Sequence, residues 1–391
     1  MAVVNLARGR HERVLHGHPW VFQSEVENIR GDYQPGDIVS VVGNRGMFLG
    51  KGYINPKSQI IVRMMTSHDE PIDAAFIRRR IERAWQYRQR VLKDTDSCRV
   101  IFGEADFLPG LIVDKFGDIL VIQSLALGIE RWLDEIVEAL NDVIQPRGIY
   151  ERNDVPVREL EGLQQRKGFL TGEFDPKLVI TENGLKMQVD VAEGQKTGYF
   201  LDQRENRFAI RKFIRPGDRV LDCFSNVGGF ALNAAAAGAG EVLAVDASAE
   251  ALQAVRANAE LNGLQNQIRL EEGNAFDILR RLESERQQFD LIVLDPPAFA
   301  KNKGALEGAA RGYKEINLRA MKMLPEGGFL VTCSCSYHMN PDLFQAVVED
   351  AAFDARRRLR LVEVRAQAPD HPIVVGYPES HYLKCLIYEV L

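Results

Sequence analysis

The spacing of apolar residues changes along this chain and divides it into regions. Up to residue 72, short apolar runs alternate with turn signals such as Gln34-Pro35-Gly36-Asp37, which predicts a small β-rich domain. We expect its strands at residues 20–22, 38–42, 47–49 and 60–65. From residue 76 apolar residues recur at helical spacing, and Asp73 stands before them as a helix N-cap.

The next region predicts a small α+β module. Strand patterns lie at 99–102, 111–115 and 119–123, a helix with one apolar face at 129–143, and a further strand at 148–152. The charged run from 152 to 167 follows neither pattern, so we expect a loop or lid there. These patterns give the module no chemistry of their own.

From residue 171 onward the pattern predicts a parallel sheet. Asn183-Gly184 between two strand patterns indicates a hairpin, because both central residues of its turn need positive φ. Strands and helices then alternate, which is typical of a doubly wound sheet that binds ligands at the carboxyl ends of its strands. The expected strands are 219–224, 241–246, 267–271, 289–295, 328–334, 359–365 and 383–390, with helices at 204–213, 229–237 and 248–262. We therefore expect three domains, at residues 1–72, 73–175 and 176–391.

Composition places the chain among soluble globular proteins, with 46% hydrophobic and 27% charged residues. No window reaches the roughly 18 apolar residues of a membrane span, and the N-terminus carries charges where a secretory signal is apolar. We therefore expect a cytoplasmic protein with no membrane partner. The five cysteines are odd in number and widely scattered, which argues against a disulfide framework.

The net charge of −6 argues against a chain that coats nucleic acid along its whole length, yet it allows a local basic face. Between residues 76 and 93, seven basic residues accompany the single acid Glu82. A charged helix face is usually only solvated. So unequal a stripe in an acidic protein is also a candidate for phosphate contact.

The segment VLDCFSNVGGF, residues 220–230, follows the first strand of the predicted sheet. Its glycines let a ligand approach the backbone, but the pattern is not the G-x-G-x-x-G of dinucleotide sites. An acid at the strand end, Asp222, followed by Gly228 is typical of S-adenosylmethionine (SAM) sites. Asp246 ends the next strand, where it can accept from both ribose hydroxyls or cap a helix. Together the two signals favour a nucleoside ligand.

Two further strand ends carry candidate residues. Asn274, followed by Ala275, stands where methyltransferases often use Asp to accept from the adenine amine. The next strand ends in DPPAF, residues 295–299, whose prolines fix the backbone beside the Asp295 carboxylate. This motif also resembles that of amino-group methyltransferases acting on adenine or cytosine, so N-methyl transfer is the alternative activity.

The fifth strand ends in FLVTCSCSYH, residues 329–338, with Cys333 and Cys335 on one side of the strand. Methylation of an exocyclic amine needs no nucleophile, whereas carbon 5 of a pyrimidine must first be activated by a thiolate that adds to carbon 6. A cysteine opposite Asp295 therefore favours carbon-5 methylation, with the carboxylate hydrogen-bonding the base as charge develops. Both thiols could instead be small core residues, and a metal site with His338 lacks partner ligands elsewhere.

These motifs, together with GHPWVF near the N-terminus and GQKTGYFLDQR at 194–204, resemble the family of large-subunit ribosomal RNA cytosine carbon-5 methyltransferases that carry an N-terminal PUA domain. The resemblance spans nearly the whole chain. It implies an α/β fold, in which a Rossmann-like class I methyltransferase domain with a seven-stranded, mostly parallel sheet follows a small α+β domain and a β-rich PUA-like barrel. It also implies SAM as cofactor and large-subunit ribosomal RNA, naked or in an assembly particle, as partner, and it leaves room for a homodimer.

The resemblance further implies roles for particular residues. Two registers fit the nucleophile of the family's T-C-S motif, since Cys333 matches by its letters and Cys335 by its distance from the start of the strand. Cys335 lies nearer the carboxyl edge, which favours it. The catalytic candidates are Cys335, Asp295 and Cys333. The cofactor candidates are Phe200, Asp202, Arg204, Asp222, Phe224, Ser225, Gly228, Asp246, Asn274, Ala275, Asp295 and Pro296, and the RNA-binding candidates are Arg78, Arg79, Arg83, Lys301 and Lys303. A non-catalytic RNA-binding assembly factor is the remaining alternative, and the presence of Asp295 and both cysteines speaks against it.

Overall fold

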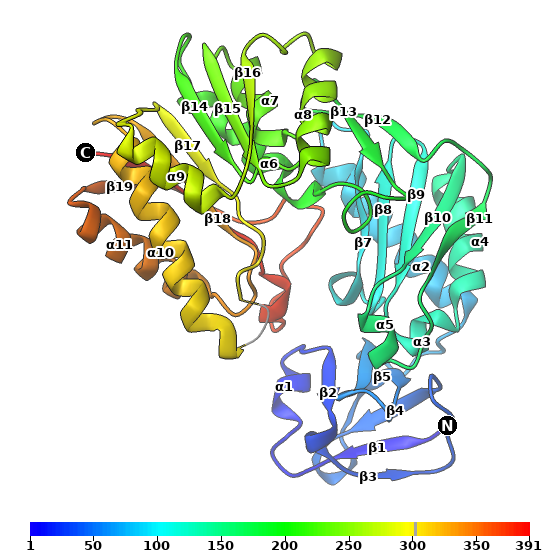
Figure 1. Cartoon of the computed structure of the whole chain (residues 1–391). Helices are drawn as coiled ribbons and strands as arrows, with labels where there is room; N and C mark the ends of the chain where they lie inside the picture. The colour runs from blue at the N-terminus through cyan, green and yellow to red at the C-terminus, as the bar shows by residue number, and fades with distance from the viewer. Residues whose placement is uncertain (301–302) are drawn as a thin grey trace. The chain divides into compact units, whose positions relative to one another are not determined.

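The computed structural model describes residues 1–300 and 303–391, which form two compact units. Unit 1 consists of Met1–Thr181, Val189–Leu201 and Pro369–Ser380. Unit 2 consists of Glu182–Gln188, Asp202–Ala368 and His381–Leu391. The chain therefore passes between the units several times, and Figure 1 shows its course by colour. No helix in the described part of the chain has the length and apolar character needed to cross a membrane.

The N-terminal part of unit 1 is a six-stranded sheet with the order β2-β6-β5-β4-β1-β3. Its strands are β1 (Val3–Leu6), β2 (Trp20–Phe22), β3 (Val26–Arg30), β4 (Ile38–Val42), β5 (Phe48–Ile54) and β6 (Ile60–Thr66), with the short helices α1 (Glu12–Leu15), η1 (Gln23–Glu25) and η2 (Asn44–Gly46) between them. Fully buried residues alternate with half-buried ones along β1 and β4, as a sheet with one buried face requires. Val4, Val39 and Val41 belong to a hydrophobic core that serves this sheet.

The hydrophobic pattern located four of these six strands and missed β1 and β3. β1 pairs with β3 on one side and with β4 on the other. β3 is the edge strand and has the sequence VENIR, with exposed Glu27, Asn28 and Arg30. An edge strand with a polar surface carries no alternation, so pairing with a distant segment defines it.

The middle of unit 1 combines helix α2 (Ala74–Val91) with a five-stranded sheet in the order β11-β10-β9-β8-β7. The strands are β7 (Cys98–Phe102), β8 (Leu111–Phe116), β9 (Ile119–Ser124), β10 (Gly148–Asn153) and β11 (Arg166–Thr171), and the 3-10 helix η3 (Gly103–Asp106) follows β7. Asp73 caps α2 as predicted, because its carboxylate accepts a hydrogen bond of 2.8 Å from Phe76 N. Phe76, Ile77 and Ile81 pack into a second core cluster of this unit.

Two expectations for this region are corrected in part by the structure. The helix predicted at 129–143 is interrupted, forming α3 (Leu127–Glu130) and α4 (Leu133–Ile144), because Trp132 between them has non-helical dihedrals of −105° and 13°. The charged run 152–167, expected as a loop or lid, contains α5 (Val157–Leu160) and the first residues of β11. Its charges are paired within unit 1, with Arg158 3.0 Å from Glu130 and Arg166 2.8 Å from Glu151.

The predicted hairpin is confirmed. β12 (Lys177–Glu182) and β13 (Leu185–Asp190) form a two-stranded sheet. The two residues between them, Asn183 and Gly184, have φ angles of 52° and 79°. Both are positive, as a type I′ turn requires.

Unit 2 is built on a seven-stranded sheet with the order β16-β15-β14-β17-β18-β20-β19. Its strands are β14 (Arg219–Cys223), β15 (Glu241–Asp246), β16 (Ile268–Glu272), β17 (Leu291–Leu294), β18 (Phe329–Ser334), β19 (Leu359–Arg365) and β20 (Lys384–Val390). Neighbouring strands from β16 to β18 are parallel, whereas β20 runs antiparallel to both β18 and β19. The predicted α/β fold with a mostly parallel sheet is therefore confirmed, and β20 begins at the edge where β18 ends.

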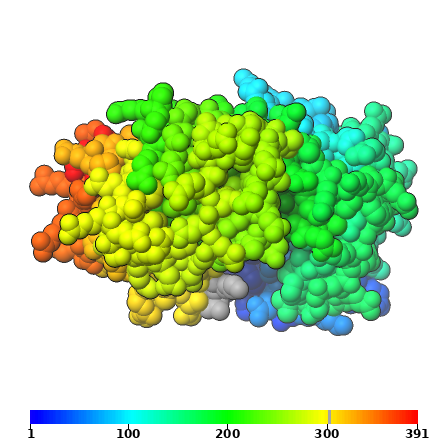
Figure 2. Space-filling view, turned by 45° about the horizontal axis from the view of Figure 1, so that its top comes forward, coloured from blue at the N-terminus to red at the C-terminus, as the bar shows by residue number. Residues whose placement is uncertain are grey.

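Helices cover the sheet of unit 2. They are α6 (Arg204–Ala209), α7 (Gly229–Ala236), α8 (Ala249–Leu261), α9 (Ala275–Ser284), α10 (Leu306–Met323) and α11 (Pro341–Ala355), with the 3-10 helices η4 (Leu201–Gln203), η5 (Ile210–Phe213), η6 (Lys303–Ala305) and η7 (Pro378–Ser380) elsewhere in the chain. Helices α9, α10 and α11 pack side by side, and α6, α7 and α8 form a second group (Figure 1). Leu221, Ile292 and Leu330 in the strands are completely buried, and Figure 2 shows the outer atoms of this unit from one side.

Candidate active site

The turn after β14 is tightly wound at the carboxyl edge of the unit 2 sheet. Phe224, Asn226 and Gly228 all have positive φ, of 65°, 51° and 87°. Ser225 closes the turn, since its hydroxyl donates to the Asp222 carbonyl at 2.8 Å and its carbonyl accepts from Gly228 N at 2.8 Å. A side chain at Gly228 would lie 2.9 Å from Val255 Cγ1, so glycine is required for close packing between α7 and α8.

Asp222 is buried below this turn with an incomplete set of hydrogen bonds. Its Oδ2 accepts from Ala231 N at 3.0 Å, and its Oδ1 has no hydrogen-bond partner among the residues that the structure describes. Burial and, to a smaller extent, the nearby carboxylates of Asp295 and Asp246 together raise the pKa of Asp222 to about 7. A positively charged group bound here would compensate the buried charge, so this carboxylate fits a zwitterionic ligand such as SAM.

Asp246 at the end of β15 connects two loops. Its carboxylate accepts from Asn226 N at 2.8 Å and from Ser248 N at 3.0 Å. The side chain is half-buried, and each oxygen can accept a second hydrogen bond. This arrangement is compatible with the ribose contact predicted for Asp246, and the contact itself stays a prediction.

Asn274 serves as the N-cap of α9. Its Oδ1 accepts from Phe276 N at 2.9 Å, and its side chain is exposed. Ala275 is the first helical residue and is buried. Capping therefore explains an amide at position 274 without any ligand, and a contact to adenine stays a prediction.

Asp295 is oriented by a residue that the sequence interpretation did not select. Gln203 Nε2 donates to Asp295 Oδ1 at 2.8 Å, and Gln203 Oε1 accepts from Asn206 Nδ2 at 2.7 Å. Gln203 is buried and lies within the GQKTGYFLDQR segment. Its position between the selected residues Asp202 and Arg204 was the signal that could have identified it as a site residue. The amide fixes one oxygen of the carboxylate next to the two prolines.

The other candidates from the GQKTGYFLDQR segment fall in both units. Asp202 in unit 2 accepts a hydrogen bond of 2.6 Å from the Tyr382 hydroxyl. Arg204 in unit 2 is completely buried, and its Nε lies 3.3 Å from Glu205 Oε1. Phe200 belongs to unit 1, where Lys196 Nζ lies 4.6 Å from the centre of its ring. Cofactor contacts by these three residues stay predictions.

The two cysteines of β18 differ in burial. Cys333 is fully buried and pairs across the sheet with Cys385. The contact with Cys385 and burial raise the pKa of the Cys333 thiol well above its usual range. Cys335 is partly exposed, and its Sγ lies 3.9 Å from the Pro296 carbonyl oxygen. The thiol at the DPPAF motif is therefore that of Cys335.

Two serines hold the backbone on either side of Cys335. Ser334 Oγ lies 3.0 Å and Ser336 Oγ 3.1 Å from the Tyr313 hydroxyl oxygen of α10. Ala300 N, directly after the DPPAF motif, donates to Ser336 Oγ at 3.2 Å. All three hydroxyl-bearing residues are buried. The cysteine is thus positioned by hydrogen bonds that do not involve its own side chain.

Lys384 was missed because it lies at the start of an apolar strand and belongs to no recognised motif. Its Nζ donates to the Ser336 carbonyl at 2.7 Å and to the Tyr382 carbonyl at 2.8 Å. Burial lowers its pKa to about 8, and the negative charge of a Cys335 thiolate acts in the opposite direction. The antiparallel course of β20 brings Lys384 opposite Ser334, and strand order was the only signal that could have found it.

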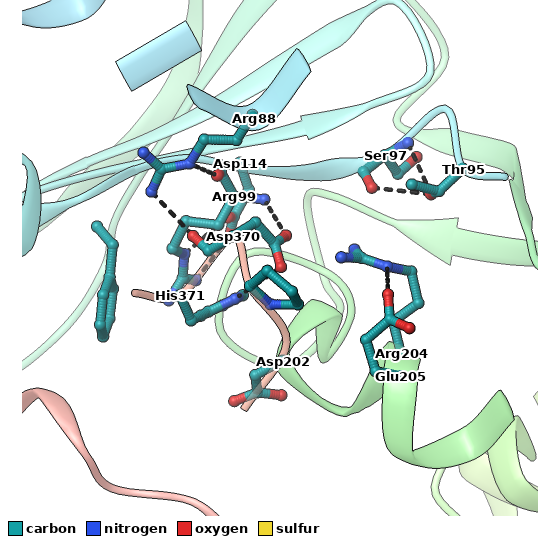
Figure 3. A network of polar contacts seen from close by, with 12 residues as sticks. Arg88, Thr95, Ser97, Arg99, Asp114, Asp202, Arg204, Glu205, Asp370 and His371 are labelled. Atoms are coloured by element: carbon teal, nitrogen blue, oxygen red, sulfur yellow. Dashed lines mark hydrogen bonds and ion pairs between the residues drawn. The ribbon is translucent and has the colours of Figure 1, made fainter. Parts of the chain in front are cut away.

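The RNA-binding candidates of α2 have different surroundings. Arg78 pairs with Asp142 at 2.6 Å, Arg79 pairs with Glu70 at 3.0 Å, and Arg83 is exposed. Arg88 of the same basic stripe is completely buried and donates to Asp106 at 2.7 Å. It also donates to the Asp370 carbonyl at 2.9 Å, and Figure 3 shows these two residues. The stripe is therefore partly structural.

The two lysine candidates lie in the segment after the DPPAF motif. Lys303 begins η6, and Lys301 lies outside the described residues. RNA binding by either lysine stays a prediction.

Comparison with known proteins finds a matching family for the N-terminal part of the chain and another for the C-terminal part. Residues 4–67 match the family described as a PUA-like domain, and residues 164–388 match the family described as an S-adenosylmethionine-dependent methyltransferase. Over its full length, the chain resembles a chain described as a SAM-dependent methyltransferase from Streptococcus mutans, with a TM-score of 0.85, 21% identity and 100% coverage of both chains. At that identity the likeness concerns the fold alone.

Full-length relatives with higher sequence identity show more specifically which methyltransferase family the chain belongs to. The chain is 46% identical over 393 residues to ribosomal RNA large subunit methyltransferase I of Shewanella denitrificans, covering 99% of both chains. It is 45% identical over 384 residues to the protein of the same name from Erwinia tasmaniensis, covering 97% of both. The predicted SAM dependence and the predicted PUA-like domain are thereby confirmed. The chain therefore belongs to the family of ribosomal RNA large subunit methyltransferase I, SAM-dependent methyltransferases with an N-terminal PUA-like domain.

Proposed function

We propose that this protein methylates carbon 5 of a cytosine in large-subunit ribosomal RNA, with Cys335 as the nucleophile. The names of its close relatives support the RNA substrate. The observation that carries the carbon-5 chemistry is the position of the Cys335 thiol, partly exposed and 3.9 Å from the Pro296 carbonyl oxygen. Methyl transfer to an exocyclic amine has no use for a thiol at that place.

In the proposed reaction the Cys335 thiolate forms a bond to carbon 6 of the cytosine. The electrons of the double bond between carbons 5 and 6 then make carbon 5 nucleophilic, so that it takes up the methyl group. SAM supplies that methyl group and leaves as S-adenosylhomocysteine. Removal of the proton from carbon 5 restores the double bond, and the bond between carbon 6 and sulfur breaks to regenerate the thiolate. The target base must be unpaired or flipped out of a helix for the thiol to reach it.

Two side chains support this chemistry. Asp295, oriented by Gln203, would accept a hydrogen bond from the cytosine amine and, in its protonated form, would donate one to N3 as negative charge develops on the ring. Lys384, with a pKa of about 8, carries a positive charge at neutral pH and interacts electrostatically with Cys335. Its ammonium group would stabilise the thiolate that must form before the base is attacked.

The cofactor would be held by the ends of β14, β15 and β17. The buried Asp222 Oδ1 offers an acceptor for a cationic ligand group, and Asp246 offers further acceptors for ribose hydroxyls. The positive φ angles around Phe224 and Gly228 keep the backbone of this turn compact, which leaves space for a ligand.

The test is to incubate the protein with SAM and large-subunit ribosomal RNA from a strain that lacks the modification, and then to identify the product nucleoside by mass spectrometry. We expect 5-methylcytosine. An N-methylated cytosine or adenine would replace the proposal with amino-group methylation through DPPAF. No methylated nucleoside, with RNA binding intact, would favour a non-catalytic assembly factor.

A further inference from the structure

An aromatic side chain in unit 1 is exposed and yet held in a fixed position. Phe107 is 49% exposed and has a φ of 60°, in the left-handed region that bulky residues rarely adopt. Its backbone N donates to the Glu104 carbonyl at 3.1 Å. The preceding residue, Asp106, is paired with the buried Arg88. A large apolar ring is thus presented to solvent by a constrained turn, which does nothing for the hydrophobic core.

Phe107 borders a basic cavity of about 310 Å³ in unit 1. The cavity is lined by Thr66, Ser67, His68, Glu70, Phe76, Arg79, Arg80, Arg83 and Phe107. Three arginines outnumber the single carboxylate of Glu70. That carboxylate already accepts from the Thr66 hydroxyl at 2.7 Å and from Arg79 at 3.0 Å. The cavity therefore keeps a positive charge that suits an anion.

The arginines of this cavity are not equivalent. The Arg80 guanidinium lies 4.8 Å from the ring centres of both Phe76 and Phe107 and donates to the Met65 carbonyl at 3.3 Å. It is thereby fixed beside the aromatic ring. Arg83, one turn further along α2, is exposed and forms no ion pair within residues 1–300 and 303–391. A free guanidinium next to an exposed aromatic ring combines the two groups that single-stranded nucleic acids require.

We propose that this cavity binds one unpaired nucleotide of the RNA substrate, with its base stacked on Phe107 and its phosphate paired with Arg83. Arg80 extends the stacking surface, and Thr66, Ser67 and His68 offer hydrogen-bonding groups to the base or ribose. The inference rests on the proposed function, because it presumes an RNA substrate, and it adds that unpaired RNA is held by unit 1 itself. Stacking accepts any base, so this site contributes affinity and placement rather than sequence recognition.

The first experiment replaces Phe107 in the full-length protein. Asn tolerates the left-handed conformation, so Phe107→Asn removes the ring without straining the turn. We expect binding of a fluorescein-labelled unpaired RNA oligonucleotide, followed by anisotropy, to weaken about tenfold, the effect of one lost base–aromatic stack. Phe107→Trp keeps a stacking ring and should bind as the wild type does. Phe353→Ala removes another exposed phenylalanine, on α11, and should change nothing.

The second experiment separates the phosphate contact from stacking by its salt dependence. Arg83→Gln should lower the slope of log K against log salt by about 0.7, the value for one phosphate of a single strand. Phe107→Asn should leave the slope unchanged. Arg90→Gln removes an exposed cation of the same helix that does not line the cavity, and its slope should equal that of the wild type.

The outcomes distinguish this inference from the function on which it rests. If the wild type binds RNA and Phe107→Asn binds it equally well, the nucleotide site is wrong and the proposed function is unaffected. If Arg83→Gln and Arg90→Gln lower the slope equally, the stripe is a diffuse basic surface and the site is again wrong. If the wild type binds no RNA, both proposals fail. Thermal midpoints equal to that of the wild type show that each variant is folded.

Discussion

The ends of β14 and β18 belong to the same sheet, separated by one strand, and they bury polar groups in opposite ways. At the end of β14, Asp222 is buried with one carboxylate oxygen lacking a hydrogen bond within the described chain. At the end of β18, Ser334, Ser336 and Lys384 all have hydrogen-bond partners around Cys335. The first region leaves one buried carboxylate oxygen without a partner among the described residues, whereas these three polar groups of the second region are paired within the protein. If Cys335 and Asp222 have the roles proposed above, the thiol is positioned by contacts within the protein, whereas Asp222 offers one buried carboxylate oxygen to a ligand.

The strongest test of the β18 region replaces its two cysteines, one at a time, with alanine. Cys335→Ala should lower methylation by on the order of 10⁴-fold or more, as removal of a nucleophile does, while SAM binding persists. Cys333→Ala should leave activity within about tenfold of the wild type and cost roughly 1 kcal/mol of stability, because its thiol is packed in the sheet. Transfer of labelled methyl groups to RNA measures the first effect and urea unfolding the second. The reverse result would make Cys333 the nucleophile.

Replacing Lys384 tests whether its positive charge at the end of β18 contributes to catalysis. Lys384→Met should lower the methylation rate about 10²-fold at neutral pH, because no cation then stabilises the thiolate. In the wild type the ammonium is present below the Lys384 pKa of about 8 and is lost above it, so activity should fall on the alkaline side of pH 8. The variant should lack this alkaline limb in its pH–rate profile. An identical alkaline limb in both proteins would assign it to another group.

Neutralisation of Asp222 tests whether its unpaired carboxylate oxygen binds the cofactor. Asp222→Asn should weaken SAM binding about 10- to 100-fold, the effect of one charge-assisted hydrogen bond, as measured by calorimetry. The Asp222 pKa of about 7 is raised above the value of 3.8 expected in the unfolded chain. Its contribution to stability is therefore complete below about pH 4 and lost as the pH rises through 7. Without SAM, the wild type should lose more stability than the variant across this window.

The smallest expected effect concerns the hydroxyl between the two serines. Tyr313→Phe removes one oxygen that contacts both Ser334 and Ser336, so it should cost about 1–3 kcal/mol of stability. Methylation should fall severalfold because the backbone around Cys335 becomes less fixed. SAM binding at the β14 end should not change, and this selectivity distinguishes a local effect from general destabilisation.

Local signals in the sequence predicted much of the fold. Asp73 is a helix cap, as expected, because a cap depends only on residues a few positions away. Asn183-Gly184 predicted its hairpin for the same reason. The parallel strands from β14 to β18 were located because each is a short apolar run that ends at a turn.

What the sequence did not reveal depends on distant pairing. Gln203 meets Asp295 across 92 positions, and Lys384 meets Ser336 across 48. Neither contact leaves a periodic or local pattern. Arg88 is a residue that the sequence suggested for the surface but that the structure buries. A basic stripe on a helix does not indicate which of its arginines pairs with an aspartate from another element.

The place of β20 in the sheet has a consequence for how the chain is made. β19 is synthesised before β20 but pairs with it, and β18 also has β20 as its neighbour on that side. A nascent chain that has not yet delivered β20 leaves β18 with an open edge and β19 without that pairing. The same strand brings Lys384 Nζ to the carbonyl of Ser336, the residue after Cys335, so this cation reaches the end of β18 only when the sheet is completed. Under the proposed mechanism, a chain arrested before residue 384 would lack the cation that stabilises the Cys335 thiolate, so activity would depend on the strand that completes the sheet.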